Sequence, residues 1–249
     1  MAKPQHIELA EGRIQIPILY EDRSVLAIDK PAGWMLAPDS WDQTGRNLQL
    51  ALQSSLNAGD FWARSRNLKY LRFIHRLDAD TTGLTLFAKS PGALRAYSEL
   101  FEERRVEKTY LAVVHGIPKE SSWTCSLPLQ PDPAKKGRMM VARKPSGESK
   151  DAQTHFEVLQ KLPKTALVQA RPTTGRTHQI RVHLAAAGHP VVGDILYGPN
   201  PAAPRNELAL RATELAFRDP FQRRNIRIQA PTIWFLREHG FAGEERVSR

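Results

Sequence analysis

The stretch FIHRLDADTTG, residues 73–83, places one carboxylate, Asp78, between a basic residue and a small, hydroxyl-rich turn. Apolar residues lie before the HRLD sequence at 71, 73 and 74 and after the stretch at 84, 86 and 87. This is typical of a loop held between two buried strands. Reactive groups are commonly mounted on such loops. A carboxylate held in this way can stay ionised and act on a substrate, although the four residues HRLD alone would more often form a surface ion pair.

Around this loop, the first half of the chain alternates between expected strands and helices. Two strands, 14–20 and 25–28, are predicted around a Glu-Asp-Arg turn, and the sequence KPAG at 30–33 ends the second of them. A helix is expected over 46–56. Ser90 and Pro91 supply an N-cap and a first-turn proline for another helix, whose apolar residues recur at the spacing of a buried stripe.

The second half of the chain reads as strands followed by one well-marked helix. Strands are expected at 108–116, 153–161 and 166–171, and the last two are predicted to pair around a turn at 162–164. After them, Ile180, Leu184 and Ala187 share one face of a predicted helix that Gly188 ends. Arg181 lies about 100° round from Ile180, so it can leave the core and reach a site, although a lone arginine there is usually solvated.

Length and composition favour one folded domain. The chain has 249 residues, of which 41% are hydrophobic, and this is enough to bury a sizeable core. No composition shift, long linker or internal repeat divides it. We therefore predict a single domain over 1–249, with a core from about 16 to 236. The expected fold class is α+β, with a mixed, mostly antiparallel central β-sheet flanked by helices.

The charge balance predicts a polyanionic partner. Thirty-six Lys and Arg against twenty-six Asp and Glu leave a net charge of +10. Nucleic acid is the first candidate, but charge alone separates RNA neither from DNA nor from an anionic membrane. Five basic residues bracket residues 139–142 and are candidate phosphate contacts, although a solvated charge run is the commoner outcome. They are Lys135, Lys136, Arg138, Arg143 and Lys144.

Several other classes of protein are disfavoured. The only cysteine, Cys125, allows no internal disulfide, fits a reducing cytoplasm and is interpreted as a packed, inert thiol. The N-terminus lacks a secretory leader, and no apolar run approaches the roughly 18 residues needed to span a membrane. A cytoplasmic protein without a membrane partner is therefore expected.

No cofactor-binding pattern stands out either. His178 and His183 are five residues apart, which is not the spacing of a helical metal pair. The chain has no Cys-x-x-Cys, no P-loop and no dinucleotide-binding glycine fingerprint. We expect no metal, nucleotide or methyl-donor cofactor.

Three motifs resemble those of the RluA-type pseudouridine synthases. The loop 75–83, followed by a strand that ends in Ala-Lys at 88–89, resembles the His-Arg-Leu-Asp signature, with Thr82 in place of the usual Ser. The run GRTHQIRVHL at 175–184 resembles the family's Gly-Arg-x-His-Gln-Ile-Arg-x-His-Leu motif, and the similarity continues through 188–194 and 197–198. Lys-Thr-Tyr at 108–110 is similar to the family's Lys-x-Tyr.

The resemblance implies an RNA pseudouridine synthase, which isomerises uridine in structured ribosomal or transfer RNA by base flipping and an Asp-dependent rearrangement of the glycosidic bond. In this reading Asp78 is the catalytic carboxylate, Arg181 pairs with it and favours its ionised form, and Tyr110 packs on the target base. Arg76 fills the space that the base leaves. The other motif positions expected to bind the substrate are His75, Thr81, Arg176, His178 and Gln179.

Some features leave alternatives open. Leu-Arg-Ala at 210–212 stands where the family usually has Leu-His-Ala, and Asp80 is a second carboxylate close to Asp78. The resemblance implies a single catalytic domain over 1–249, without the separate N-terminal RNA-binding domain that some members carry. It does not identify the RNA, and a monomer is expected. A catalytically silent RNA-binding or ribosome-assembly factor on the same fold is the main alternative. An N-glycosidase that breaks the bond without rejoining it is the other.

Overall fold

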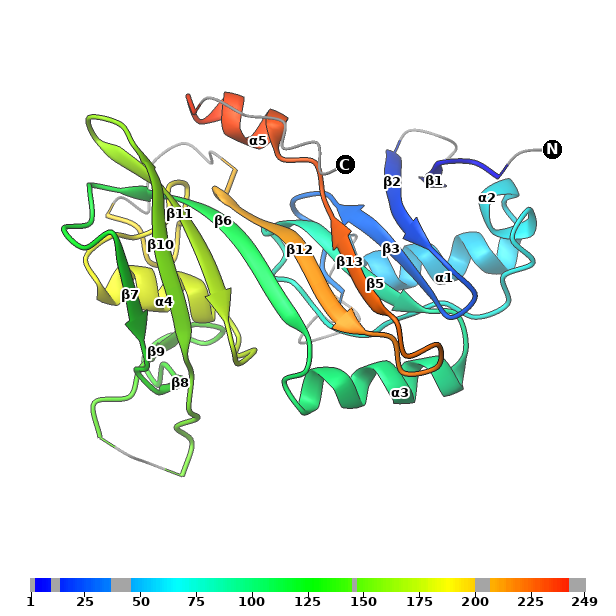
Figure 1. Cartoon of the computed structure of the whole chain (residues 1–249), viewed down its shortest axis with the longest axis horizontal. Coiled ribbons are helices and arrows are strands. Elements are labelled where there is room, and N and C mark those ends of the chain that lie inside the picture. The colour runs from blue at the N-terminus through cyan, green and yellow to red at the C-terminus, as the bar shows by residue number, and fades with distance from the viewer. Residues whose placement is uncertain (1–2, 10–13, 37–45, 145–146, 200–206, 242–249) are drawn as a thin grey trace. The chain divides into compact units, whose positions relative to one another are not determined.

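The computed structural model describes residues 3–9, 14–36, 46–144, 147–199 and 207–241 (Figure 1). The chain forms two compact units. Unit 1 comprises residues 1–106 and 214–230, and unit 2 comprises residues 107–213 and 231–249. Both units combine a mostly antiparallel sheet with few helices, so the predicted α+β class is confirmed. The single catalytic domain remains a prediction.

The sheet of unit 1 carries the Asp78 loop. Four strands pair antiparallel in the order β1-β2-β3-β5, and β4 pairs with the C-terminal end of β5. The second part of β12, residues 214–218, pairs with β13. These strands are β1 (His6–Leu9), β2 (Ile14–Glu21), β3 (Val25–Lys30), β4 (Arg72–Phe73), β5 (Thr82–Ala88), β12 (Leu210–Arg218) and β13 (Asn225–Gln229).

Three helices lie in the described residues of unit 1, and the two longer ones begin at side-chain caps. In α1 (Leu48–Ala58) the Asn47 side chain accepts the N–H of Leu50, and Gly59 ends the helix with a left-handed φ of 71°. The short helix α2 (Phe61–Arg64) follows. In α3 (Pro91–Glu102) Ser90 is the predicted N-cap and accepts the N–H of Ala93. Fully buried residues from β2, β3 and α1 belong to one hydrophobic core of unit 1.

Unit 2 is built on a second antiparallel set of strands, in the order β6-β11-β10-β7, with a separate β8–β9 hairpin. The predicted pairing of the two strands around residues 162–164 is confirmed. The elements are β6 (Glu107–His115), β7 (Ser122–Cys125), β8 (Leu129–Pro131), β9 (Met139–Val141), β10 (Thr154–Lys161), β11 (Thr165–Pro172), α4 (Gln179–Ala186) and α5 (Ile233–Glu238).

Helix α4 is buried on more than one side, unlike the single buried face that the sequence predicts. It contacts β10 and β11 and also β9, so residues 179–184 are all buried. Ala187, which the periodicity places on the buried face, is exposed because the helix has ended before it. Gly188 follows with a left-handed φ of 83°, as the helix-ending position requires.

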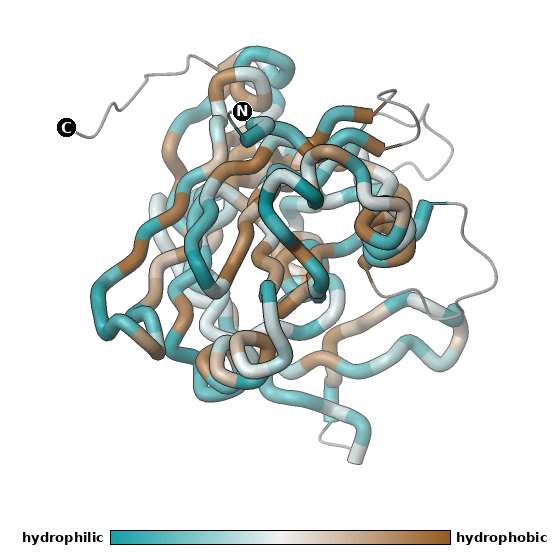
Figure 2. Tube along the Cα trace, turned by 90° about the vertical axis from the view of Figure 1, so that its right-hand side faces the viewer, coloured by the Kyte–Doolittle hydropathy of each residue, from teal (hydrophilic) through white to brown (hydrophobic). Residues whose placement is uncertain are grey.

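Figure 2 shows how hydropathy varies along the chain. Hydrophobic and hydrophilic stretches alternate along it (Figure 2). The charged run at 102–105, at the end of α3, is exposed. Within the described residues, no helix combines the length and hydropathy needed to cross a membrane.

Candidate active site

The Asp78 loop of unit 1 joins β4 to β5 and is fixed by the backbone. The N–H of Ile74 donates to the carbonyl of Leu86 at 2.9 Å, and the N–H of Thr81 donates to the carbonyl of Asp78 at 3.2 Å. Leu77 is buried, whereas Asp78 is half-buried. The loop is therefore anchored by its apolar neighbour and presents the carboxylate near the surface of the unit.

Lys30 is a second anchor of this loop and is fully buried at the end of β3. Its ammonium donates to three backbone carbonyls, those of Pro31 and Trp34 at 2.9 Å and that of Ala79 at 2.7 Å. The N–H of Gly33 also donates to the carbonyl of Ala79, at 2.9 Å. Lys30 thus ties the KPAG turn to the residue next to Asp78.

Burial lowers the pKa of Lys30 to about 8, while the negative charges of Asp80 and Asp78 act in the opposite direction. A buried ammonium is tolerated here because each of its three N–H groups has a carbonyl acceptor. Sequence reasoning treated KPAG as a strand-ending turn and missed this role. The available signal was a lysine two residues after the predicted strand at 25–28 and directly before a proline.

Replacing Lys30 with Met should destabilise the protein. The change leaves the carbonyls of Pro31, Trp34 and Ala79 without their donor, and we expect a loss of about 2–4 kcal/mol in the free energy of unfolding together with reduced turnover. Urea unfolding measures the first effect. The exposed Lys69→Met variant is the matched control and should stay within about 0.5 kcal/mol of wild type. Equal unfolding midpoints for both variants would contradict the anchoring role.

Three predicted substrate-binding residues lie on the same loop. His75 Nε2 accepts the N–H of Leu86 at 3.2 Å, and its ring stacks on Phe101 with centroids 4.7 Å apart. These contacts favour a positioning role for His75. Arg76 is exposed. Thr81 is buried, and within the described residues its hydroxyl has no hydrogen-bond partner.

Unit 2 holds Arg181 in a buried ion pair. Its Nε donates to Oδ2 of Asp194 at 2.7 Å and its Nη2 donates to Oδ1 at 2.8 Å, with the side chains 4% and 0% exposed. Such a bidentate pair fixes the plane of the guanidinium group. The Arg181 side chain is therefore held out of the solvent, whereas an arginine on a helix flank is usually solvated.

Asp194 is the partner that sequence reasoning did not assign. Burial by itself would raise the pKa of this carboxyl, but the hydrogen bonds and charge of Arg181, with the N–H groups of Leu196 and Tyr197, hold it below its usual value. Asp194 is thus an anion, and its two hydrogen bonds hold the side chain of Arg181, which lies on α4. The signal was the Gly-Asp at 193–194, which matched the family motif without a stated role.

Gln179 organises the turn before α4. Its amide nitrogen donates to the Gln153 carbonyl and the Thr154 hydroxyl, and its amide oxygen accepts from the Thr174 hydroxyl and the Arg176 N–H, all within 3.0 Å. The side chain is 4% exposed, and these four bonds use its full hydrogen-bonding capacity. This arrangement favours a positioning role over the predicted contact with RNA.

The other predicted residues of unit 2 surround the same turn or lie on β6. His178 has a left-handed φ of 55°, and its Nδ1 lies 2.9 Å from the hydroxyl of Tyr197. Arg176 donates from Nε to the carbonyl of Asp151 at 3.0 Å. Tyr110 pairs with Ala170 across β6 and β11 and is half-buried against the core. Its ring is thus held by the sheet.

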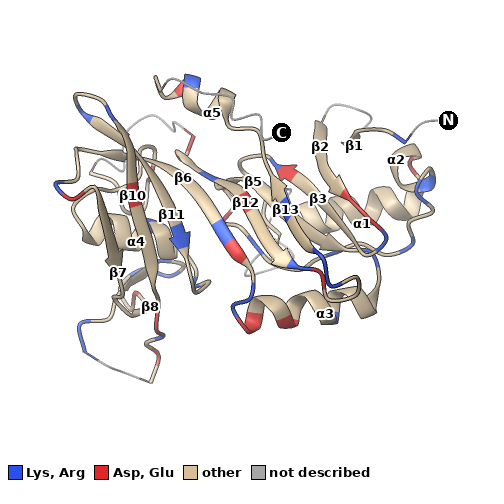
Figure 3. Ribbon diagram, viewed as in Figure 1, with Lys and Arg blue, Asp and Glu red and all other residues tan. Residues whose placement is uncertain are grey.

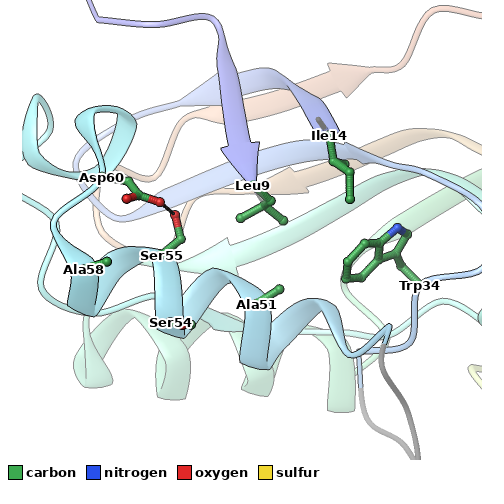
Figure 4. Close-up of a pocket in the computed structure, with 8 residues that line it drawn as sticks. All are labelled: Leu9, Ile14, Trp34, Ala51, Ser54, Ser55, Ala58 and Asp60. Carbon is green, nitrogen blue, oxygen red and sulfur yellow. Dashed lines mark hydrogen bonds between the residues drawn. The ribbon is translucent and has the colours of Figure 1, made fainter. Parts of the chain in front are cut away.

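Other possible sites are less suited to this chemistry. A cavity of about 260 Å³ lies beside α1 in unit 1 (Figure 4) and is lined mainly by apolar residues, among them Leu9, Ile14 and Trp34. Cys125 packs against the core of unit 2, and burial raises the pKa of its thiol, as expected of an inert cysteine. Within the described part of the chain, no three His, Cys, Asp or Glu side chains cluster as metal ligands would.

Comparison with known proteins identifies the family. Residues 24–186 match the model for RNA pseudouridylate synthase, a span that includes Asp78, Tyr110 and Arg181. The chain belongs to the RNA pseudouridylate synthase family. The family predicted from the three motifs is therefore confirmed.

Several relatives of this synthase family are similar over most of the chain. The ribosomal large subunit pseudouridine synthase C of Buchnera aphidicola is 34% identical over 86% of this chain and 66% of its own length. The synthase of that name from Escherichia coli is 35% identical over the same shares of the two chains. The dual-specificity RNA pseudouridine synthase RluA of Vibrio cholerae is 34% identical over 82% of this chain and 78% of its own. The chain thus spans just under two thirds of the length of the first two relatives.

Two solved human structures have the same fold. RNA pseudouridylate synthase domain containing 1 has a TM-score of 0.70 and 28% identity, covering 88% of this chain and 84% of that chain. RNA pseudouridylate synthase domain containing 4 has a TM-score of 0.69 and 25% identity, covering 88% and 92%. These likenesses support the α+β assignment.

Proposed function

We propose that this protein is an RNA pseudouridine synthase that isomerises uridine in structured RNA. The observation that carries the proposal is the family match over 24–186. Asp78 and Arg181, which the motifs single out in that span, each lie on a segment fixed by buried neighbours. A catalytically silent RNA-binding factor would not need to retain both residues together with Tyr110.

The reaction breaks the bond between C1′ of the ribose and N1 of uracil and forms a bond between C1′ and C5. The C5 proton leaves to solvent and N1 gains a proton, so the conversion is redox-neutral. Asp78 either attacks the sugar or stabilises positive charge there while the base rotates. Both routes demand an ionised carboxylate, and we propose that Arg181 favours that form as its cationic partner.

Before the reaction the uridine must leave its stack, which costs a few kcal/mol. Arg76, an exposed residue two positions before Asp78, is the candidate to fill the space that the base vacates. Tyr110 would hold the extruded base and assist removal of the C5 proton. Basic residues of the +10 chain would offset part of the cost by binding phosphates.

The partner we propose is ribosomal or transfer RNA. The names of the Buchnera aphidicola and Escherichia coli relatives specify the large ribosomal subunit, which favours ribosomal RNA. The name of the Vibrio cholerae relative specifies dual specificity, which keeps a second RNA open. A cytoplasmic, single-domain monomer without a metal or nucleotide cofactor completes the proposal.

Tyr110→Phe separates catalysis from packing. The variant keeps the half-buried ring on β6 and removes only the hydroxyl, so we expect an unchanged thermal unfolding midpoint and turnover reduced at least tenfold. Turnover is measured as tritium released from C5 of labelled uridine in transcribed RNA. Full activity in a correctly folded variant would leave Tyr110 with a packing role only.

Mapping pseudouridines in cells that lack this gene tests the proposed function and identifies the target. We expect specific sites in ribosomal or transfer RNA to lose pseudouridine and to regain it when the wild-type gene, but not an Asp78→Asn version, is restored. An unchanged map in every RNA class would favour the silent RNA-binding factor. Abasic sites with free uracil in the purified reaction would favour the N-glycosidase.

A further inference from the structure

Tyr197 connects the basic β8–β9 hairpin to the α4 region of unit 2. Its hydroxyl accepts the N–H of Met139, the first residue of β9, at 2.9 Å. The same hydroxyl lies 2.9 Å from His178 Nδ1, to which it can then donate. Around it, Met139 and Tyr197 pack against a small apolar cluster that includes Val182 of α4.

The ring of Tyr197 is also shared by two guanidinium groups. The Cζ atom of Arg138 lies 5.3 Å from the ring centroid, and that of Arg181 lies 5.2 Å from it. Both distances fall within the range of cation–π contacts, and the aromatic ring orients each planar group. One side chain therefore contacts a hairpin arginine and the arginine that we propose as the partner of Asp78.

The two arginines differ in how their charge is compensated. Arg181 remains a cation but is paired with the Asp194 carboxylate through two hydrogen bonds of 2.7 and 2.8 Å. Arg138 forms an ion pair with Asp132, but Oδ2 of that carboxylate lies 3.7 Å from Nε, which is too long for a hydrogen bond. Within the described residues Arg138 Nε is buried without an acceptor, although 38% of the side chain is exposed. Arg138 thus presents an oriented and incompletely neutralised cation at the surface.

Arg138 differs in this way from the basic residues around it. Lys and Arg residues, coloured blue in Figure 3, occur on the loops beside β8. Lys135, Lys136, Arg143 and Lys144 are all exposed, whereas Arg138 is half-buried against Tyr197. A guanidinium held in one orientation loses less freedom when it binds a phosphate than a solvated lysine does.

We propose that Arg138 binds a backbone phosphate of the RNA and that Tyr197 is a positioning residue that couples this contact to the Arg181 guanidinium. A phosphate at Arg138 offsets the repulsion between two cations that share one ring. It thereby stabilises the arrangement in which Tyr197 holds both β9 and Arg181. The inference rests on the proposed function, because it assigns the phosphate to the RNA substrate.

The salt dependence of RNA binding tests the phosphate contact without requiring turnover. The probe is a labelled, unmodified transcript of large-subunit ribosomal RNA, titrated between about 50 and 200 mM KCl. Arg138→Met should reduce the slope of log affinity against log salt by about 0.7–0.9, and Arg138→Lys should restore it. Lys161→Met is the control and should keep the wild-type slope. Lys161 is exposed and is the last residue of β10. A wild-type slope in Arg138→Met would overturn the contact.

A double-mutant cycle tests the coupling through Tyr197. Tyr197→Phe keeps the ring and removes the hydroxyl that binds the Met139 N–H, so we expect kcat to fall about tenfold with little change in affinity for the transcript. Arg138→Met should also lower kcat about tenfold when the transcript is saturating. The double variant should lose no more than the more impaired single variant. Independent losses that multiply to about a hundredfold would overturn the coupling.

Hydrogen exchange separates failure of this inference from failure of the proposed function. RNA binding should protect the Met139 amide and α4 together in the wild-type protein, and Tyr197→Phe should abolish the protection of α4 but not binding. Equal protection of α4 in both proteins would contradict the coupling even if neither forms pseudouridine. A wild-type protein that binds RNA with the expected slope and protection but forms no pseudouridine would instead contradict the proposed function.

Discussion

Asp78→Asn should abolish pseudouridine formation, with turnover reduced by at least about 10⁴-fold, while folding and RNA binding are retained. Asn keeps the size and most of the hydrogen-bonding shape of Asp but removes the charge and the nucleophilic oxygen. The backbone bonds that fix the loop, such as Thr81 N–H to the Asp78 carbonyl, do not depend on the side chain. The measurement is tritium release from C5 under single-turnover conditions.

Asp80→Asn is the matched control for this variant. Asp80 is an exposed carboxylate two residues along the same loop, at the variable position of the motif. We expect it to retain activity within a fewfold of wild type. If Asp80→Asn lost activity and Asp78→Asn retained it, the assignment of the catalytic carboxylate would be wrong.

Arg181→Met should have the second-largest effect, because it removes two functions at once. It takes away the proposed cationic partner of Asp78, and it leaves the buried Asp194 carboxylate without its bidentate partner. Breaking a buried pair on one side typically costs about 3–5 kcal/mol. We therefore expect reduced stability as well as a turnover loss of at least about a hundredfold.

A second substitution separates these two effects. Arg181→Met combined with Asp194→Asn removes both charges and keeps an amide oxygen to accept the N–H groups of Leu196 and Tyr197. The double variant should recover most of the stability in urea unfolding but none of the turnover. Recovery of turnover along with stability would show that Arg181 serves only to neutralise Asp194.

The fold could be predicted where the local sequence pattern of an element is enough to determine its structure. The Ser90 cap, the paired strands around residues 162–164 and the turn at 21–23 follow from residue type and periodicity alone. The burial of α4 did not follow, because its extra contacts come from β9, which lies about 40 residues earlier in the chain. The periodicity of apolar residues predicts only one buried face of a helix. It cannot predict that a segment distant in sequence, here β9, packs against another face.

The site was predictable as a set of motif residues but not as a network. The motifs predicted Asp78, Tyr110 and Arg181, and their catalytic roles remain predictions. They did not identify Lys30 and Asp194, because a lysine beside a proline and an aspartate after a glycine have many ordinary explanations in sequence. Their functions depend on partners 49 and 13 residues away, which only the folded chain brings within hydrogen-bond distance.

Product analysis of the purified protein tests the central claim most directly. Unmodified large-subunit ribosomal and transfer RNA transcripts, labelled with tritium at C5 of uridine, are incubated with wild-type protein and digested to nucleosides for chromatography. The account predicts tritium release matched by an equal amount of pseudouridine, no free uracil, and neither product with Asp78→Asn. Free uracil in place of pseudouridine, or wild-type levels of pseudouridine from Asp78→Asn, would contradict it.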